Sequence, residues 1–317
     1  MISPESLLTI IYVLADDFCQ AHPDLVRACQ GRRGPAQKLA PAETMTLCLM
    51  SQWERFDGES SFWRFAQQRL HRLFPALPHR TQFNRAARRL EPLLAAFFQH
   101  LADLLGAREA AYEILDRFGV ATRRSGRRGA GWMGEYANKG KCTRLGFFHG
   151  VQVLSVVTPA GAITGLAVAP GSTKDQPMAA ALFEARHRGQ RAAATKVSTA
   201  GQSAASQIYL ADKGFSGPNR HREWFATTGA LLVCAPQKGH APEWPASQRR
   251  IIASMRQRVE TVHEKLLRRF HLEKERPHCI GGFFTRLCAK AALHNFCIWL
   301  NRQLGRRDLA FADLLGW

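Results

Sequence analysis

The sequence has no long apolar run, and this absence argues against a membrane-spanning helix. The most apolar stretch near the N-terminus, from Leu7 to Ala15, is nine residues long and follows an acidic residue, Glu5. A membrane-spanning helix needs about 20 apolar residues, and a secretory signal begins with basic ones. We therefore expect neither segment and predict no membrane partner.

Closely spaced cysteines are also missing. The chain has 8 cysteines, and no two of them have the C-x2-C spacing of a structural zinc site. His278, Cys279, His294 and Cys297 come nearest to a metal cluster, but the last two lie in an apolar helical stretch where packing is the commoner explanation. The pattern predicts a cytoplasmic protein with reduced thiols.

Acidic residues are scarce relative to basic ones. The chain has 44 Lys and Arg against 25 Asp and Glu, a formal net charge of +19 and an isoelectric point of about 10.3. The hydrophobic fraction of 46% is still that of an ordinary globular protein with a buried core. Most of the positive surplus lies in residues 107–317. It predicts a polyanionic partner.

One basic stripe stands out before residue 106. No acidic residue occurs between Glu59 and Glu91, and the interval contains seven arginines: Arg64, Arg69, Arg72, Arg80, Arg85, Arg88 and Arg89. A guanidinium group can bond two phosphate oxygens at once, so the stripe predicts contact with nucleic acid. A solvated basic face would have the same composition.

Residues 1–106 have apolar residues at three- and four-residue spacing, which predicts an all-helical domain. Pro75 and Pro78 interrupt the pattern, and Thr81 is a plausible N-cap for a helix over 82–90. A turn followed by such a helix resembles the DNA-reading part of a helix-turn-helix, although an amphipathic surface helix has the same pattern. We interpret 1–106 as a helical DNA-binding domain.

After residue 106 the pattern becomes that of an α/β domain. Strands are expected over 112–115, 147–157, 163–168, 208–211 and 230–235, with helices over 176–186, 218–226 and 246–270 and a loop over 189–206. Asp116 would end the first strand, Asp212 would end the fourth, and Glu260 would lie in the last helix. In an open α/β sheet, chemistry gathers at the carboxyl ends of strands.

Three carboxylates at one edge of a sheet repel one another unless cations lie between them. Two Mg2+ ions about 4 Å apart suit phosphodiester chemistry and oxygen ligands. Glu264, one turn beyond Glu260 on the same helix face, is a rival third carboxylate. Individually, each acid also has a structural explanation as a turn or surface residue.

Several motifs, in this order, resemble a DDE transposase of a bacterial insertion sequence. They are Leu115-Asp116, Phe147 to Val151, Pro170 to Asp175, Ala211 to Phe215 and Val259 to Val262, together with Asp16 to Cys19, Phe74-Pro75 and Arg80 to Arg85 near the start. The resemblance implies a ribonuclease H-like catalytic core in residues 107–317. It also implies a protein of the bacterial cytoplasm that associates with the nucleoid when it is bound to DNA.

The resemblance further implies a metal-binding catalytic triad of Asp116, Asp212 and Glu260. The triad would hold two Mg2+ ions, for which Mn2+ can substitute, and the protein would act on double-stranded DNA (terminal inverted repeats and target) as a homodimer. The residues expected to contact DNA are Arg256, Lys213, Arg123, Arg124, Arg127, Arg128, Lys139, Lys141, Arg80, Arg85, Arg88 and Arg89.

The chain departs from the family pattern at Arg117, where a small hydroxyl residue is common. It also departs at Ala253 and Leu267, where a Tyr and a Lys are usual around the catalytic Glu, while the Arg of that signature is present as Arg256. The function implied is metal-dependent cleavage at the ends of an insertion sequence and strand transfer into target DNA. Two alternatives remain open: a catalytically inactive, domesticated DNA-binding protein, and a metal-dependent nuclease without strand transfer.

Overall fold

The computed structural model of the 317-residue chain describes residues 2–30, 37–123, 132–134, 136–197, 207–235 and 244–316, with side chains omitted for 188–197. The chain forms two compact units. Unit 1 combines residues 1–106 and 132–134 with 264–317, and unit 2 comprises residues 107–131 and 135–263. No helix among the described residues is long and apolar enough to cross a membrane.

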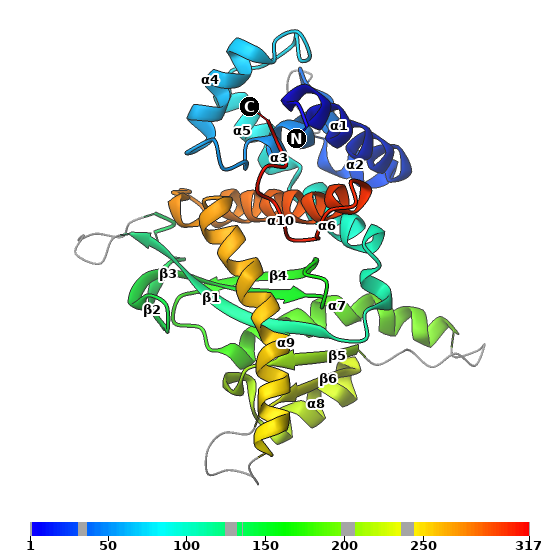
Figure 1. Ribbon diagram of the computed structural model, residues 1–317, viewed down its shortest axis with the longest axis vertical. Coiled ribbons are helices and arrows are strands. Elements are labelled where there is room, and N and C mark those ends of the chain that lie inside the picture. The colour runs from blue at the N-terminus through cyan, green and yellow to red at the C-terminus, as the bar shows by residue number, and fades with distance from the viewer. Residues whose placement is uncertain are drawn as a thin grey trace. The chain divides into compact units, whose positions relative to one another are not determined.

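Unit 1 is helical, as the spacing of its apolar residues predicts. Its elements are α1 (Pro4–Ala21), α2 (Pro23–Cys29), α3 (Pro41–Met50), α4 (Glu59–Arg69), α5 (Arg80–Arg89), α6 (Glu91–Leu104), the π-helical turn η4 (Lys265–Arg269), the 3-10 turn η5 (Leu272–Lys274) and α10 (Ile280–Gln303). α10 lies alongside α6 and also packs on α3 (Figure 1). Most of its residues are buried, so α10 forms the centre of this unit.

The C-terminal segment lies in a different unit from the one expected. The sequence predicts a single domain over 107–317, whereas residues 264–317 pack with the N-terminal helices. The physical reason is the surface of α10, which buries residues on every side, including Phe283, Leu287 and Phe296. A helix that is apolar all round must be surrounded by other elements, and α3, α6 and α5 surround it here.

Unit 2 is built on a six-stranded mixed sheet with the ribonuclease H-like order. Its strands are β1 (Glu113–Arg123), β2 (Asn138–Cys142), β3 (Gly146–Val157), β4 (Ile163–Pro170), β5 (Gln207–Ala211) and β6 (Ala230–Cys234). β3 pairs antiparallel with β1, β2 and β4, and β5 pairs parallel with both β1 and β6. β2 and β4 pair with successive halves of β3.

Helices cover both faces of this sheet. α7 (Asp175–Val197) and α8 (Pro218–Thr228) pack over a core that includes Leu115, Leu154 and Tyr209. α9 (Ala246–Glu264) runs across the other face (Figure 1), where Val259 and Val262 are buried. Because successive strand residues point to opposite faces, Asp116, next to Leu115, points to the α9 side.

Three local expectations differ from the structure. β1 continues to Arg123, so Asp116 lies within the strand instead of ending it. α7 continues to Val197, across the first half of the loop expected over 189–206, because its Ala, Arg and Gln residues favour helix. The N-cap of α5 is His79, whose ring nitrogen accepts from the backbone N–H of Thr81; Thr81 itself is inside the helix.

Candidate active site

Asp116 and Asp212 lie side by side because two parallel strands place them there. The register of β1 and β5 pairs Leu115 with Ala211, and each aspartate is the next residue in its chain. Asp116 has 17% of its side chain exposed and Asp212 has 48%. The two aspartates are therefore neighbours, as expected from their positions after short strands, although only β5 ends at this point.

The guanidinium group of Arg256 bridges the two aspartates. One terminal nitrogen lies 3.5 Å from Oδ2 of Asp116, and the other lies 3.4 Å from Oδ1 of Asp212. Both distances are longer than a close charge-assisted hydrogen bond, so the arginine holds the pair loosely. The side chain was expected to contact a DNA phosphate, and its position between the carboxylates is a feature that the sequence did not reveal.

The surroundings of Asp116 make its ionised form less favourable than it is in water. Burial is the largest cause and raises its pKa to about 6; Arg256 and the backbone N–H of Arg117 oppose the rise, while the charges of Asp212 and Glu260 add to it. Asp175 also has a raised pKa because of burial, which its ion pair with Arg117 partly offsets. A buried carboxylate beside like charges is stabilised by any cation that can approach it.

Glu260 lies on α9 one helical turn after Arg256, with its side chain exposed. Its charge acts on Asp116, so it belongs to the same site. Among the described residues, no three His, Cys, Asp or Glu side chains are grouped closely enough to hold a metal. The three predicted ligands are thus brought near one another but are not assembled into a coordination sphere.

The donor chemistry of the site fits a divalent cation. All three acids offer carboxylate oxygens, the ligands that Mg2+ prefers, and Asp116 and Asp212 already converge on one cationic group, the guanidinium of Arg256. The Nε of that arginine is buried and has no hydrogen-bond acceptor among the described residues. Its outward rotation would leave two carboxylates facing a common point.

A buried Ser–His pair fixes α9 on the sheet beside this site. Ser155 lies directly opposite Asp116 in the β1–β3 register, and its Oγ is 2.7 Å from Nε2 of His263 on α9. The imidazole packs against the ring of Phe118 at 4.3 Å. His263 is three residues after Glu260, so this contact sets the position of the helix that bears Glu260 and Arg256.

The remaining predicted DNA contacts in unit 2 are spread along its surface. Arg123 is the last residue of β1, and Lys139 and Lys141 are exposed on β2. Lys213 is exposed directly after Asp212, and its backbone N–H donates to the Asp212 carboxylate at 2.7 Å. Arg124, Arg127 and Arg128 lie outside the described residues.

In unit 1 the predicted contacts share one helix. Arg80, Arg85, Arg88 and Arg89 all belong to α5 and are exposed. The inner side of α5 buries Phe83, which stacks on Trp63 at 4.7 Å, and Ala87. α5 is therefore an amphipathic helix with an arginine-rich outer face, a pattern that suits either of the two explanations offered by the sequence.

A charged network anchors α5 to the rest of unit 1. Glu59 at the start of α4 accepts from Arg80 at 3.3 Å, from Asn84 at 2.6 Å and from Arg286 of α10 at 3.2 Å.

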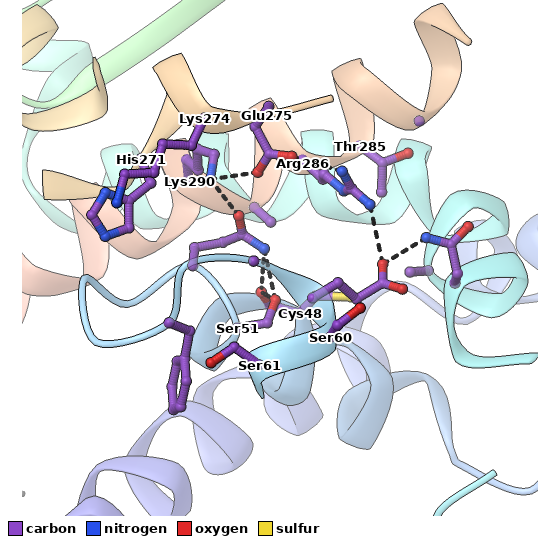
Figure 2. Close-up of a pocket in the computed structure, with 18 of the residues that line it drawn as sticks. Cys48, Ser51, Ser60, Ser61, His271, Lys274, Glu275, Thr285, Arg286 and Lys290 are labelled. Atoms are coloured by element: carbon purple, nitrogen blue, oxygen red, sulfur yellow. Dashed lines mark hydrogen bonds and ion pairs between the residues drawn. The ribbon is translucent and has the colours of Figure 1, made fainter. Parts of the chain in front are cut away.

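The same network continues into the interior of unit 1. Arg286 also bonds Glu275 at 2.6 Å, and Glu275 pairs with the buried Lys290 at 2.9 Å (Figure 2). Burial alone would raise the pKa of Glu275, but the two cations outweigh it and the pKa is lowered. The network lines a cavity of about 450 Å³ and was not predicted.

Comparison with known proteins identifies the class of this fold. A family model described as a transposase DDE domain matches residues 114–296, which include all three predicted carboxylates. No curated protein sequence matches the chain at a significant level.

The solved structures that resemble the chain have low sequence identity to it. The piggyBac transposase in a synaptic complex with hairpin DNA has 9% identity and a TM-score of 0.30, covering 78% of this chain and 54% of that one. The present chain thus spans about half the length of that transposase. The Mos1 transposase paired-end complex with the left transposon end has 12% identity and a TM-score of 0.21, covering 84% and 80%. The Mos1 mariner paired-end complex with Mn has 12% identity and a TM-score of 0.23, and the match covers 94% of this chain and 97% of that one.

Proposed function

Because the chain belongs to the DDE transposase family, we propose that it cuts DNA at the ends of an insertion sequence and joins those ends to target DNA. One observation carries the proposal: Asp116 and Asp212 stand side by side on adjacent strands and converge on a single cation, the guanidinium of Arg256. Glu260, on the helix that crosses this face, supplies the third carboxylate.

Asp116, Asp212 and Glu260 are the residues that would hold the metal ions, two Mg2+ or Mn2+. When bound, such a pair of ions activates an attacking hydroxyl group and stabilises the leaving oxygen of a phosphodiester. The raised pKa of Asp116 means that cation binding and loss of its proton are coupled. Arg256, once released from the aspartates, would turn its buried Nε and terminal nitrogens to a DNA phosphate.

Double-stranded DNA, as terminal inverted repeats and as target, is the proposed partner. The net charge of +19 and the exposed arginines of α5 support a large electrostatic contribution to binding, which salt would weaken steeply. We propose that the protein binds this DNA as a homodimer and that it acts in the bacterial cytoplasm, at the nucleoid. Residues 1–106 would supply DNA binding, and residues 107–317 would supply the catalytic groups, with the last helix packed in unit 1.

The test is a cleavage and joining assay with Mg2+ or Mn2+ on duplex DNA that carries candidate element ends. Asp212→Asn removes one ligand charge with almost no change of shape, and it should abolish cutting and joining while DNA binding persists. A matched control is Asp308→Asn, which alters an acid of unit 1 that pairs with Arg302. This control should cut as the wild type does.

The assay separates the proposed function from the two alternatives. Cutting without joining of the 3′ end to a second duplex indicates a metal-dependent nuclease. Equal binding by the wild type and Asp212→Asn, with no cutting by either, indicates a DNA-binding protein that has lost catalysis. The departures from the family pattern at Ala253 and Leu267 would be consistent with such a loss of catalysis.

A further inference from the structure

A basic groove with an exposed aromatic ring is lined in part by residues that follow the two aspartates in the chain. Its volume is about 620 Å³, within the roughly 300–1,000 Å³ typical of sites for small organic ligands. Arg117, which follows Asp116, and Gly214, two residues after Asp212, both line it. The groove is therefore lined by chain neighbours of both aspartates, and it lies wholly within unit 2.

The β2–β3 hairpin supplies the aromatic ring and two of the cations. The antiparallel register pairs Lys141 with Phe147 and Lys139 with His149. Residues directly opposite each other, and those two places along, lie on the same face of a sheet. Lys139, Lys141 and Phe147 consequently share one face, with Gly140 turned to the other.

Phe147 is the most exposed large hydrophobic side chain that the structure describes, at 65%. The ammonium groups of Lys139 and Lys141 lie 5.0 and 5.2 Å from its ring centre. Both distances are within the range of cation–π attraction, which keeps the two charges at the ring. Asp175, the acid among the lining residues, pairs with Arg117. In the described part of the chain neither lysine has a carboxylate partner, so their charge is available to a ligand.

The loop over 171–174 also lines the groove. Gly171 donates its backbone N–H to the carbonyl of Gly150 at 3.0 Å and accepts from the buried Gln152 at 3.1 Å. Ser172 exchanges two hydrogen bonds with Asn138 of β2, at 2.7 and 2.9 Å.

This loop also lies very close to β2. A Cβ on Gly140 would approach the carbonyl oxygen of Gly171 to 2.3 Å, so only glycine permits the contact. The exposed Lys174 follows this loop and lines the same groove.

We propose that this groove binds an unpaired nucleotide at the end of a DNA strand, with its base stacked on Phe147 and its phosphates bound by Lys139, Lys141 and Lys174. This inference rests on the proposed function, for which it names the form of DNA that reaches the site. A base inside a duplex has both faces covered by its neighbours, whereas an unpaired base offers a face to an aromatic ring. Aromatic side chains in a basic groove are the usual means of binding single strands.

The experiment measures binding by the full chain without metal, in EDTA, so that it does not depend on catalysis. Fluorescence anisotropy compares a blunt duplex with the same duplex that carries a short unpaired 3′ extension. The extension should bind about 5- to 160-fold more tightly, the range expected for stacking of one base. Phe147→Ala should reduce this preference to that for an extension without bases and leave the blunt-duplex affinity unchanged, while Phe147→Trp should keep the full preference.

Two controls make the result specific. Phe225→Ala removes another exposed phenylalanine, 48% exposed on α8, and should leave the preference intact. An extension with abasic sites keeps the phosphates for the lysines but lacks the bases, and the wild type should bind it less tightly than the normal extension. If the abasic extension binds as tightly as the normal one, or if Phe147→Ala retains the preference, the stacking site is refuted. Failure of cutting with the preference intact would instead contradict the proposed function.

Discussion

His263 should make the stability of the protein fall as the pH is lowered. Its imidazole is buried between α9 and the sheet, bonded to Ser155 at 2.7 Å and packed on Phe118. Burial, and next the charges of Arg144 and Arg256, lower its pKa from 6.5 to about 3. The folded protein therefore keeps this histidine neutral at pH values where the unfolded chain protonates it.

The size of the effect follows from the two pKa values. Stability is fully present above the unfolded pKa of 6.5 and is lost progressively as the pH falls toward 3. Each pH unit in that window costs about 1.4 kcal/mol. Between about pH 7.5 and about pH 5 the loss from this one residue amounts to roughly 2 kcal/mol.

The measurement is urea unfolding at both pH values, followed by far-UV circular dichroism, for the wild type and for His263→Gln. Glutamine retains a donor toward Ser155 but cannot be protonated. Asp116, whose raised pKa acts in the opposite direction, is present in both proteins and cancels in the comparison. The wild type should lose about 2 kcal/mol more than the variant on acidification. An equal loss in both proteins would refute the reasoning.

Three further changes probe other parts of the structure. Glu59→Gln removes the carboxylate that holds Arg80, Asn84 and Arg286, and it should lower the free energy of unfolding in urea by about 1–3 kcal/mol. The control Glu264→Gln breaks an exposed pair with Arg268 and should lower it by less than about 0.5 kcal/mol. Equal losses in the two variants would contradict the anchoring role of Glu59. Gly140→Ala brings a methyl group against the carbonyl of Gly171, so the backbone must shift, and the protein should lose about 1–3 kcal/mol of stability. Gly281→Ala is the control, because its new methyl group meets nothing closer than 3.7 Å. An unchanged unfolding midpoint for Gly140→Ala would argue against the tight loop contact. Arg256→Gln should raise the pKa of Asp116 further, because the charge that lowers it is lost, and a carboxyl 13C titration by NMR that shows no change would rule out the bridge.

The sequence predicted the neighbours in the active site but not the way in which they are joined. Asp116 and Asp212 follow short apolar runs, and parallel pairing of those runs is enough to bring the two acids together. The continuation of β1 beyond Asp116 was missed because Arg117 and Gly119 interrupt the apolar pattern. The bridge by Arg256 was also missed, since helical spacing relates it to Glu260 but does not show how far a guanidinium group reaches across to two strands.

The α/β pattern followed from the order of strands and helices, and the ribonuclease H-like form of the sheet followed from the family resemblance. The partner of α10 did not follow. Periodicity indicates that Leu287 and Phe296 are buried, but it does not indicate against which element. The charged network of Glu59, Glu275 and Lys290 was hidden for the same reason, since its members are far apart in the sequence and each resembles a surface residue on its own.

The discontinuity of unit 1 has a consequence during protein synthesis. Residues 1–106 leave the ribosome first, but α10, around which they pack, is made only after the whole of unit 2. At about 5–20 residues per second, the intervening chain takes roughly 10–30 s to translate. During that time the apolar faces of α3 and α6 lack the helix that buries them. The newly made helical segment therefore exposes apolar surface of the kind that chaperones bind, whereas unit 2 is continuous apart from the short segment Trp132–Gly134 and does not wait for a distant part of the chain.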